Sequence, residues 1–336
     1  MKIAIIGTGA NGSCIAADLT NAGLDVTLID QWPEHVKKMQ SDGLKITMPN
    51  EILETKVKAI NLCNVCTLNE KFDYIFIIVK AYDTRWICSL IEPYLSENGL
   101  AIGLQNGMTA KDIESIVGEK RTLAAVVELS SEIFIPGEVK RNTPPTGTWF
   151  GIGSMSDFTK GRESEVIEIL KFSGKVSITE NILSAKWMKL IVNAMTMGPR
   201  SLVGLKAMEA MELDGMRDLA LKCGEEALNI GQKLGYTVEP IFGLKREDIE
   251  GSNRLLETLL DKIVKDVGPH AKDAVLHDHL KGRYSEVDLI NGLVAEEGLR
   301  LNAHCPANKL VSDLTNKIKN GELKPDPSNM KYLKDY

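Results

Sequence analysis

The chain has 336 residues, of which 43% are hydrophobic, 26% charged and only 5% aromatic, and its formal net charge is −6. This length predicts two domains, because a single domain commonly holds about 100–200 residues. The acidic balance argues against a general surface for nucleic acid or for an anionic membrane, since such surfaces need clustered, uncompensated Lys and Arg.

Strands and helices alternate through the first half of the chain. A helix is predicted over residues 13–22, and strands are predicted over residues 2–6, 25–29, 73–79, 100–104 and 123–129. Several of these strands are almost continuous apolar runs, which is typical of parallel strands covered on both faces. The pattern predicts an α/β domain of the Rossmann type, with a doubly wound parallel sheet.

The character of the chain changes twice after this region. Residues 137–179 contain β-like pieces, "GEVKRNTPPTGTWFGIGS" and "GKVSIT", around a helix at 162–172, and we expect them to extend the same sheet in antiparallel fashion. Beyond residue 181 we find only helical spacing, which predicts an all-α C-terminal domain. The helices are expected over residues 183–197, 213–234, 254–267, 285–299 and 307–320. The predicted domains are therefore 1–180 and 181–325, with a C-terminal tail at 326–336.

The cysteines and the apolar run near the N-terminus indicate the cellular compartment. The apolar run from Ile3 to Ile6 is too short for a signal peptide or a membrane span. Six cysteines in so long a chain do not make a disulfide framework and favour a reducing, cytoplasmic setting. Cys63 and Cys66 form a lone CxxC, but a zinc site needs two further ligands nearby, so no metal is predicted.

A glycine-rich loop follows the first strand and opens the first helix. It matches the GxGxxG pattern, in which glycines allow a tight turn and a close approach of the backbone to a pyrophosphate. The loop residues are Gly7, Thr8, Gly9, Ala10, Asn11 and Gly12. Because the loop lies between a strand and a helix, it predicts dinucleotide binding with the phosphates at the helix start.

Asp30 ends the second strand, eighteen residues after Gly12. A carboxylate at this spacing accepts hydrogen bonds from the adenine ribose and repels a 2′-phosphate, so NAD(H) is favoured over NADP(H). Lys37 and Lys38 are the residues best placed to weaken this preference. The alternative is that Asp30 only caps the next helix, which does not account for the spacing.

Polar residues also follow two other predicted strands. Lys80 follows the strand at 73–79, and Asn106 follows the strand at 100–104. Carboxyl ends of parallel strands meet at the edge where such folds bind ligands, so a site is favoured over a solvated lysine and a simple turn.

The helical half holds three further candidates. Lys189 and Asn193 are four residues apart and share one face of a mostly apolar helix. A buried lysine there would have a lowered pKa and could donate a proton, whereas an isolated lysine would only extend its charged end to water. Glu286 falls in the first turn of a predicted helix, where a carboxylate also complements the helix dipole. These residues alone leave both interpretations open.

Taken together, the motifs "GTGANG", "VKAYDT", "QNGM", "WMKLIVNA" and "GRYSEVDLINGLV" resemble the ketopantoate reductase (2-dehydropantoate 2-reductase) family from Met1 to about Asn320. The resemblance implies reduction of a 2-oxo acid by a nicotinamide cofactor. It implies that Lys189 is the general acid and that Glu286 binds a substrate hydroxyl. It further implies that Asn106 and Asn193 position cofactor and substrate, and that Lys80 lies by the cofactor.

The sequence also departs from the family pattern. The family usually has an Asn where Met197 stands, and a Ser that contacts the substrate carboxylate where Ala274 stands. Each lost hydrogen bond to a charged ligand costs roughly 1–3 kcal/mol unless another residue replaces it. The candidate replacements, each of which is otherwise a surface residue, are His270, Lys272, His277 and Arg283. Asp30 is a third departure, since the family usually binds NADPH through a basic residue.

We therefore expect an oxidoreductase that acts on a 2-oxo acid or 2-hydroxy acid, either ketopantoate or a related small molecule. One alternative is another Rossmann-plus-helical dehydrogenase of the opine or 3-hydroxy acid type, and substrate profiling separates the two. A second alternative is a catalytically silent NAD(H)-binding regulator, against which Lys189, Asn193, Asn106 and Glu286 argue. An exposed apolar helical face would allow a homodimer.

Overall fold

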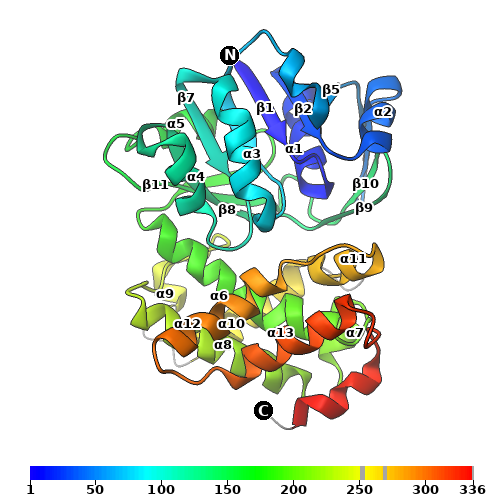
Figure 1. The fold of residues 1–336 in the computed structure, drawn as a ribbon, viewed down its shortest axis with the longest axis vertical. Coiled ribbons are helices and arrows are strands. Elements are labelled where there is room, and N and C mark those ends of the chain that lie inside the picture. The colour runs from blue at the N-terminus through cyan, green and yellow to red at the C-terminus, as the bar shows by residue number, and fades with distance from the viewer. Residues whose placement is uncertain (250–253, 268–270, 335–336) are drawn as a thin grey trace. The chain divides into compact units, whose positions relative to one another are not determined.

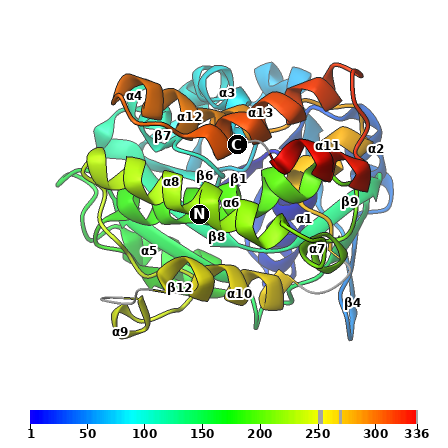
Figure 2. The same cartoon turned by 90° about the horizontal axis from the view of Figure 1, so that it is seen from below.

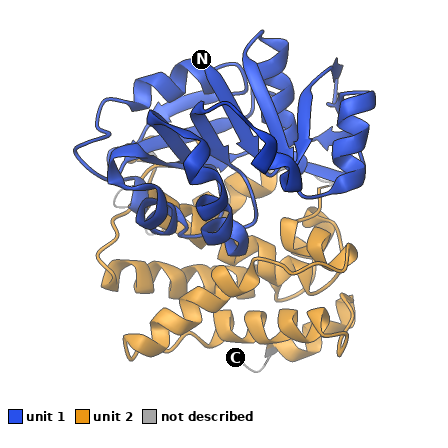
Figure 3. Cartoon of the chain, turned by 45° about the horizontal axis from the view of Figure 1, so that its top comes forward, with its two compact units in different colours: residues 1–183 blue, residues 184–336 orange. Residues whose placement is uncertain are grey.

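The computed structural model describes residues 1–249, 254–267 and 271–334. The chain divides into two compact units, Met1–Leu183 and Ser184–Tyr336 (Figure 3). Unit 1 is an α/β unit with a mostly parallel sheet, and the described part of unit 2 is helical. The predicted fold class is therefore confirmed.

The main sheet of unit 1 has eight strands in the order β12-β11-β8-β7-β6-β1-β2-β5. Neighbours from β8 to β5 pair in parallel, β11 is antiparallel to β8, and β12 is parallel to β11. The strands are β1 (Lys2–Ile6), β2 (Asp25–Asp30), β5 (Lys58–Asn61), β6 (Phe72–Ile77), β7 (Leu95–Gly103), β8 (Thr122–Glu128), β11 (Trp149–Ser154) and β12 (Lys175–Ile178).

Helices cover both faces of this sheet (Figure 1). Ile3 and Ile5 of β1 pack with side chains of α1 and α5, whereas Ala4 and Ile6 pack with side chains of α3 and α4. This division follows from the alternation of side chains along a strand, and it explains why a continuous apolar run is needed here. The helices are α1 (Ala10–Asn21), α2 (Pro33–Ser41), α3 (Thr84–Ile91), α4 (Ala110–Val117) and α5 (Glu163–Leu170).

A second sheet of unit 1 corrects one prediction. Its order is β4-β3-β10-β9, so "GEVKR" does not extend the main sheet, although the next piece, β11, does so in antiparallel fashion. The reason is visible in burial, because β10 buries only alternate residues, whereas β8, an interior strand of the main sheet, is buried at every residue. The strands are β3 (Leu44–Thr47), β4 (Ile52–Thr55), β9 (Ser131–Ile135) and β10 (Glu138–Arg141).

Unit 2 begins within a long helix, α6, and its described residues contain no strand, as predicted. Figure 2 shows α12 and α13 side by side, and both also contact α8. The helices are α6 (Ile182–Ser201), α7 (Ala207–Met211), α8 (Met216–Lys233), α9 (Arg246–Ile249), α10 (Leu255–Val267), α11 (Ala274–Leu280), α12 (Asn291–Arg300) and α13 (Pro306–Lys319). In the described part of the chain, no helix combines the length and the apolar character that a bilayer span requires.

Candidate active site

Four predicted positions meet at the carboxyl edge of the main sheet. Gly7 follows β1, Asp30 ends β2, Lys80 follows β6 and Asn106 follows β7. These strands are direct neighbours in the order β7-β6-β1-β2. Unit 1 therefore gathers its predicted residues where open α/β sheets bind their ligands.

The glycine loop has the close backbone packing that its pattern predicts. Gly7 has φ of +87°, and a Cβ there would lie 2.7 Å from the Val79 nitrogen. A Cβ at Gly12 would lie 2.2 Å from the Gly7 carbonyl oxygen. Gly9, by contrast, faces open space, with no atom within 4 Å of a Cβ placed on it.

The start of α1 is open to an anion. Helix α1 begins at Ala10, and its N-cap residue is Gly9. No side chain therefore caps the amides of its first turn. The first N–H groups of a helix have no partner inside the helix and carry the positive end of its dipole. The space at Gly9 together with these amides fits a dinucleotide pyrophosphate.

Asp30 is held in place by two hydrogen bonds. Its carboxylate accepts one from the Thr8 hydroxyl at 3.2 Å and one from the Trp32 amide at 2.8 Å. The residue is only 8% exposed. Of the two nearby lysines, Lys38 forms an ion pair with Asp42 at 2.5 Å. The hydrogen bond from Thr8 to Asp30 couples the end of β2 to the glycine loop.

His35 is a support of this loop that sequence reasoning missed. Its Nε2 lies 2.8 Å from the Thr8 carbonyl oxygen, and its Nδ1 accepts a hydrogen bond from the Gly137 amide at 2.9 Å. An accepting Nδ1 places the proton on Nε2, so the ring is neutral. Burial lowers the pKa of His35 and favours this neutral form. No sequence signal marks it, because Gly137 is 102 residues away.

Gln105 connects the segments that carry Lys80 and Asn106. Its side-chain amide donates to the Val79 carbonyl at 2.8 Å and to the Thr84 hydroxyl at 2.9 Å. Gln105 is buried, whereas Lys80 and Asn106 on either side of this bridge are half-buried. The bridge fixes the two predicted cofactor residues relative to one another.

In unit 2, Lys189 and Asn193 lie one turn apart on α6. From Ser184 to the end of this fully described helix, only Lys189 and Met197 escape complete burial. Trp187 fixes the rotation of the helix, because its Nε1 donates to the Ala227 carbonyl of α8 at 2.9 Å. The side of α6 that carries Lys189 is consequently its least buried side.

Two further side chains surround the predicted lysine. The ammonium of Lys189 lies 4.7 Å from the centroid of the Phe242 ring, and Phe242 is buried with φ of +60°. One turn before Lys189, Lys186 is only 3% exposed, and its burial lowers its pKa to about 8. The charge of Glu286 opposes that shift and raises the pKa of Lys186. Sequence reasoning missed both Lys186 and Phe242.

The sequence predicted that Glu286 lies in the first turn of a long helix, and this prediction is wrong. It is buried and precedes a short 3₁₀ helix, Val287–Leu289, and α12 begins only at Asn291. The Asn291 side chain donates to the Ala194 carbonyl of α6 at 3.0 Å and to Asn308 at 2.9 Å. The Asn of the "LINGL" motif therefore joins helices, and the chain must turn at this contact rather than continue one helix from residue 285.

The predicted replacements for the lost polar contacts are scattered. Lys272 is half-buried, His277 is buried and Arg283 is exposed, while His270 lies outside the described residues. Close to Ala274 the structure instead contains an ion pair between Arg200 and Asp273, at 2.6 Å. Sequence reasoning missed this pair.

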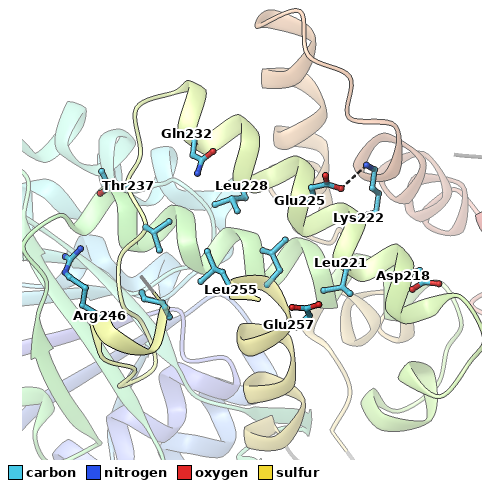
Figure 4. Close-up of a pocket in the computed structure, with 13 residues that line it drawn as sticks. Asp218, Leu221, Lys222, Glu225, Leu228, Gln232, Thr237, Arg246, Leu255 and Glu257 are labelled. Carbon is cyan, nitrogen blue, oxygen red and sulfur yellow. Dashed lines mark hydrogen bonds and ion pairs between the residues drawn. The ribbon is translucent and has the colours of Figure 1, made fainter. Parts of the chain in front are cut away.

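Other candidate sites lie apart from these residues. A groove of about 790 Å³ runs beside α8 and α10, with leucines at its base and charged side chains around it (Figure 4). It contains none of the predicted site residues. Cys63 and Cys66 are exposed and free, and the described residues contain no cluster of three metal-ligating side chains.

A glycine loop at the carboxyl edge of a parallel sheet, followed along the chain by a helical unit with a half-buried lysine, is the arrangement expected of a two-domain nicotinamide-dependent oxidoreductase. Residues 3–154 match the family model "Ketopantoate reductase PanE/ApbA", and residues 181–319 match its C-terminal counterpart. The chain belongs to the ketopantoate reductase family and is an oxidoreductase acting on a CH–OH group.

Similar proteins share the full length. The 2-dehydropantoate 2-reductase of Lactococcus lactis is 27% identical over 322 residues, covering 94% of this chain and 96% of its own. A solved D-mandelate dehydrogenase with NADH and anilino(oxo)acetate has a TM-score of 0.82 at 20% identity, covering 96% and 99% of the two chains. A dimeric ketopantoate reductase from Staphylococcus aureus has a TM-score of 0.71 at 20% identity, covering 96% and 100%.

Proposed function

We propose that this protein is an NAD(H)-preferring reductase of a small 2-oxo acid, with a substrate related to ketopantoate. The observation that carries the proposal is the placement of the half-buried Lys189 one turn before the buried Asn193 on α6. An ammonium and an amide in this arrangement suit a carbonyl that must be oriented and then protonated.

The residues divide the chemistry between them. When bound, the nicotinamide cofactor would supply the hydride that adds to the carbonyl carbon. The ammonium of Lys189 stabilises the negative charge that grows on the carbonyl oxygen and then delivers a proton to it. Glu286 accepts a hydrogen bond from the hydroxyl of the 2-hydroxy acid, the reduced form of the substrate. Asn193 orients the substrate, and Asn106 positions both cofactor and substrate.

Residues of unit 1 hold the cofactor. Residues 7–12 cradle the pyrophosphate against the start of α1, and Lys80 lies beside the cofactor. The preference for NAD(H) rests on Asp30, whose carboxylate is fixed by Thr8 and Trp32 at the end of β2. A fixed carboxylate accepts ribose hydroxyls and repels a 2′-phosphate. The presence of NADH in the D-mandelate dehydrogenase structure supports this choice.

The substrate differs from ketopantoate in its side chain. Met197 and Ala274 stand where the family pattern has an Asn and a Ser, so two polar contacts are replaced by apolar groups. Such a site favours a 2-oxo acid with a more apolar side chain. The fold neighbour D-mandelate dehydrogenase is named for a 2-hydroxy acid with an apolar, aromatic side chain.

Three broader features complete the proposal. Residues 1–180 carry the cofactor, residues 181–325 carry the substrate residues and residues 326–336 form a C-terminal extension. The protein acts as a homodimer, as the S. aureus relative is named to do. It works in the cytoplasm, where its six free cysteines stay reduced.

The test is oxidation of NADH and NADPH by the purified protein with ketopantoate and a panel of branched and aromatic 2-oxo acids. We expect a kcat/KM above about 10⁴ M⁻¹s⁻¹ with NADH and an apolar 2-oxo acid, an ordinary value for a native substrate. Lys189→Ala should abolish turnover with the affinity for NADH unchanged. Efficient reduction of ketopantoate with NADPH and poor reduction with NADH would contradict the proposal.

A further inference from the structure

A buried arginine in unit 2 has a guanidinium nitrogen without a hydrogen-bond partner in the described part of the chain. Arg200 is 1% exposed, and its Nη2 donates to Asp273 at 2.6 Å. Its Nε donates to the Thr196 carbonyl at 3.2 Å. Its Nη1 is buried and finds no hydrogen-bond partner among the described residues. Buried polar groups are nearly always paired, so an unpaired guanidinium nitrogen needs an explanation.

The position of Arg200 along α6 places it with the proposed substrate residues. At 3.6 residues per turn, Arg200 lies about 20° from Lys189 around the helix, between the directions of Lys189 and Asn193. The bond from its Nε to the carbonyl of Thr196, one turn earlier, directs the side chain back toward the N-terminal end of α6. Arg200 thus belongs to the one side of α6 that is not completely buried.

The same pair borders both altered family positions. Arg200 lies three residues after Met197 on α6, and Asp273 directly precedes Ala274 at the start of α11. In the sequence, the two members of the ion pair therefore adjoin the two positions at which an Asn and a Ser are missing. The Arg200 guanidinium carries hydrogen-bond donors, the kind of group that these two positions have lost.

We infer that Arg200, held by Asp273, binds the carboxylate of the 2-oxo acid through its Nη1. This inference rests on the proposed function and assigns its carboxylate site. A guanidinium suits this role because its planar donors match the geometry of a carboxylate. Asp273 fixes the orientation of the guanidinium and offsets part of the cost of burying its charge.

The experiment measures binding of oxamate, an unreactive 2-oxo acid analogue, to the complex of the protein with NADH, by tryptophan fluorescence. Arg200→Lys keeps a positive charge opposite Asp273 but replaces the three guanidinium nitrogens, Nη1 included, by a single ammonium nitrogen. The double variant Arg200→Gln with Asp273→Asn removes both charges, so neither is left buried alone. We expect the dissociation constant of oxamate to rise about 10- to 100-fold in the double variant, the range of a charge-assisted hydrogen bond. The affinity for NADH should not change.

A matched control uses an exposed ion pair of the same residue types. Arg217 and Asp261 pair at 2.8 Å on the surface of unit 2, with side chains 45% and 57% exposed. Arg217→Gln with Asp261→Asn should leave oxamate binding unchanged. If the Arg200 double variant does not fold, Arg200→Lys carries the test, with an expected rise of at least about 5-fold.

Oxamate binding within threefold of the wild type in both Arg200 variants would overturn the inference and leave the pair a structural role. The absence of oxamate binding to the wild-type complex would overturn it as well. Failure of the proposed function is seen separately, as no turnover of any 2-oxo acid in the panel, since oxamate binding needs no turnover.

Discussion

The ammonium of Lys189 lies 4.7 Å from the centroid of the Phe242 ring, and Phe242 holds this contact from a left-handed backbone conformation. A bulky residue rarely adopts positive φ, and the strain costs of order 1–3 kcal/mol. The other non-glycine residue with positive φ in the described chain is Asn302, a type that tolerates it well. Strain at Phe242 therefore points to a role for its ring, namely to hold the ammonium of Lys189 in place.

Replacement of the Phe242 ring should slow the reaction without affecting the cofactor. A cation–π contact contributes about 0.5–2 kcal/mol, so we expect Phe242→Leu to lower kcat about 2- to 30-fold. Phe242→Tyr keeps the ring face and should retain most of the activity. Steady-state kinetics and the dissociation constant of NADH are the measurements. Equal kcat values in the Leu and Tyr variants would exclude this role.

Two glycines of the cofactor loop should respond differently to alanine. A Cβ at Gly12 would lie 2.2 Å from the Gly7 carbonyl oxygen, so Gly12→Ala should lower the melting temperature as well as NADH binding. A Cβ at Gly9 meets no atom within 4 Å, so Gly9→Ala should fold normally. It should nevertheless weaken NADH binding at least about 10-fold, because the methyl group fills the space left for the pyrophosphate. Normal NADH binding by Gly9→Ala would argue against the proposed phosphate site.

The choice between the two nicotinamide cofactors should depend on Asp30. Asp30→Ala removes the carboxylate that we expect to accept ribose hydroxyls and to repel a 2′-phosphate. The ratio of kcat/KM for NADH to that for NADPH should fall at least about 10-fold, the effect of 1.4 kcal/mol. Asp25→Ala, at the exposed opposite end of β2, is the matched control and should leave the ratio unchanged. An unchanged ratio in Asp30→Ala would mean that Asp30 has only a structural role, as the acceptor of hydrogen bonds from Thr8 and Trp32.

The sequence predicts features whose cause lies within a short segment. The glycine loop and the strand at Lys2–Ile6 were predicted in this way, because the spacing of glycines and apolar residues acts over a few positions. The 3₁₀ turn after Glu286 was not predicted, because helical spacing continues through it while the backbone does not. There the contact of Asn291 with α6 decides where the helix begins.

Residues that support the site through distant partners escape such reasoning. His35 contacts Gly137, and Arg200 contacts Asp273, over 102 and 73 positions respectively. A single sequence offers no pattern that joins positions so far apart. Lys186 was missed for another reason, since a lysine within an apolar helix normally extends its charged end to water.

The last prediction concerns stability in acid and centres on His279. Burial lowers the pKa of His279 in α11 to about 4, and its Nε2 has no hydrogen-bond partner in the described structure. The unfolded chain therefore binds a proton at this residue near pH 6.5, whereas the folded protein does not bind it until about pH 4. The stability linked to neutral His279 is complete above pH 6.5 and is lost as the pH falls to about 4. His279→Gln should reduce this loss, measured by urea unfolding at pH 7 and pH 4.5, whereas replacement of the exposed His304 by Gln should not. Equal acid sensitivity of the wild type and both variants would show that another group controls stability in this range.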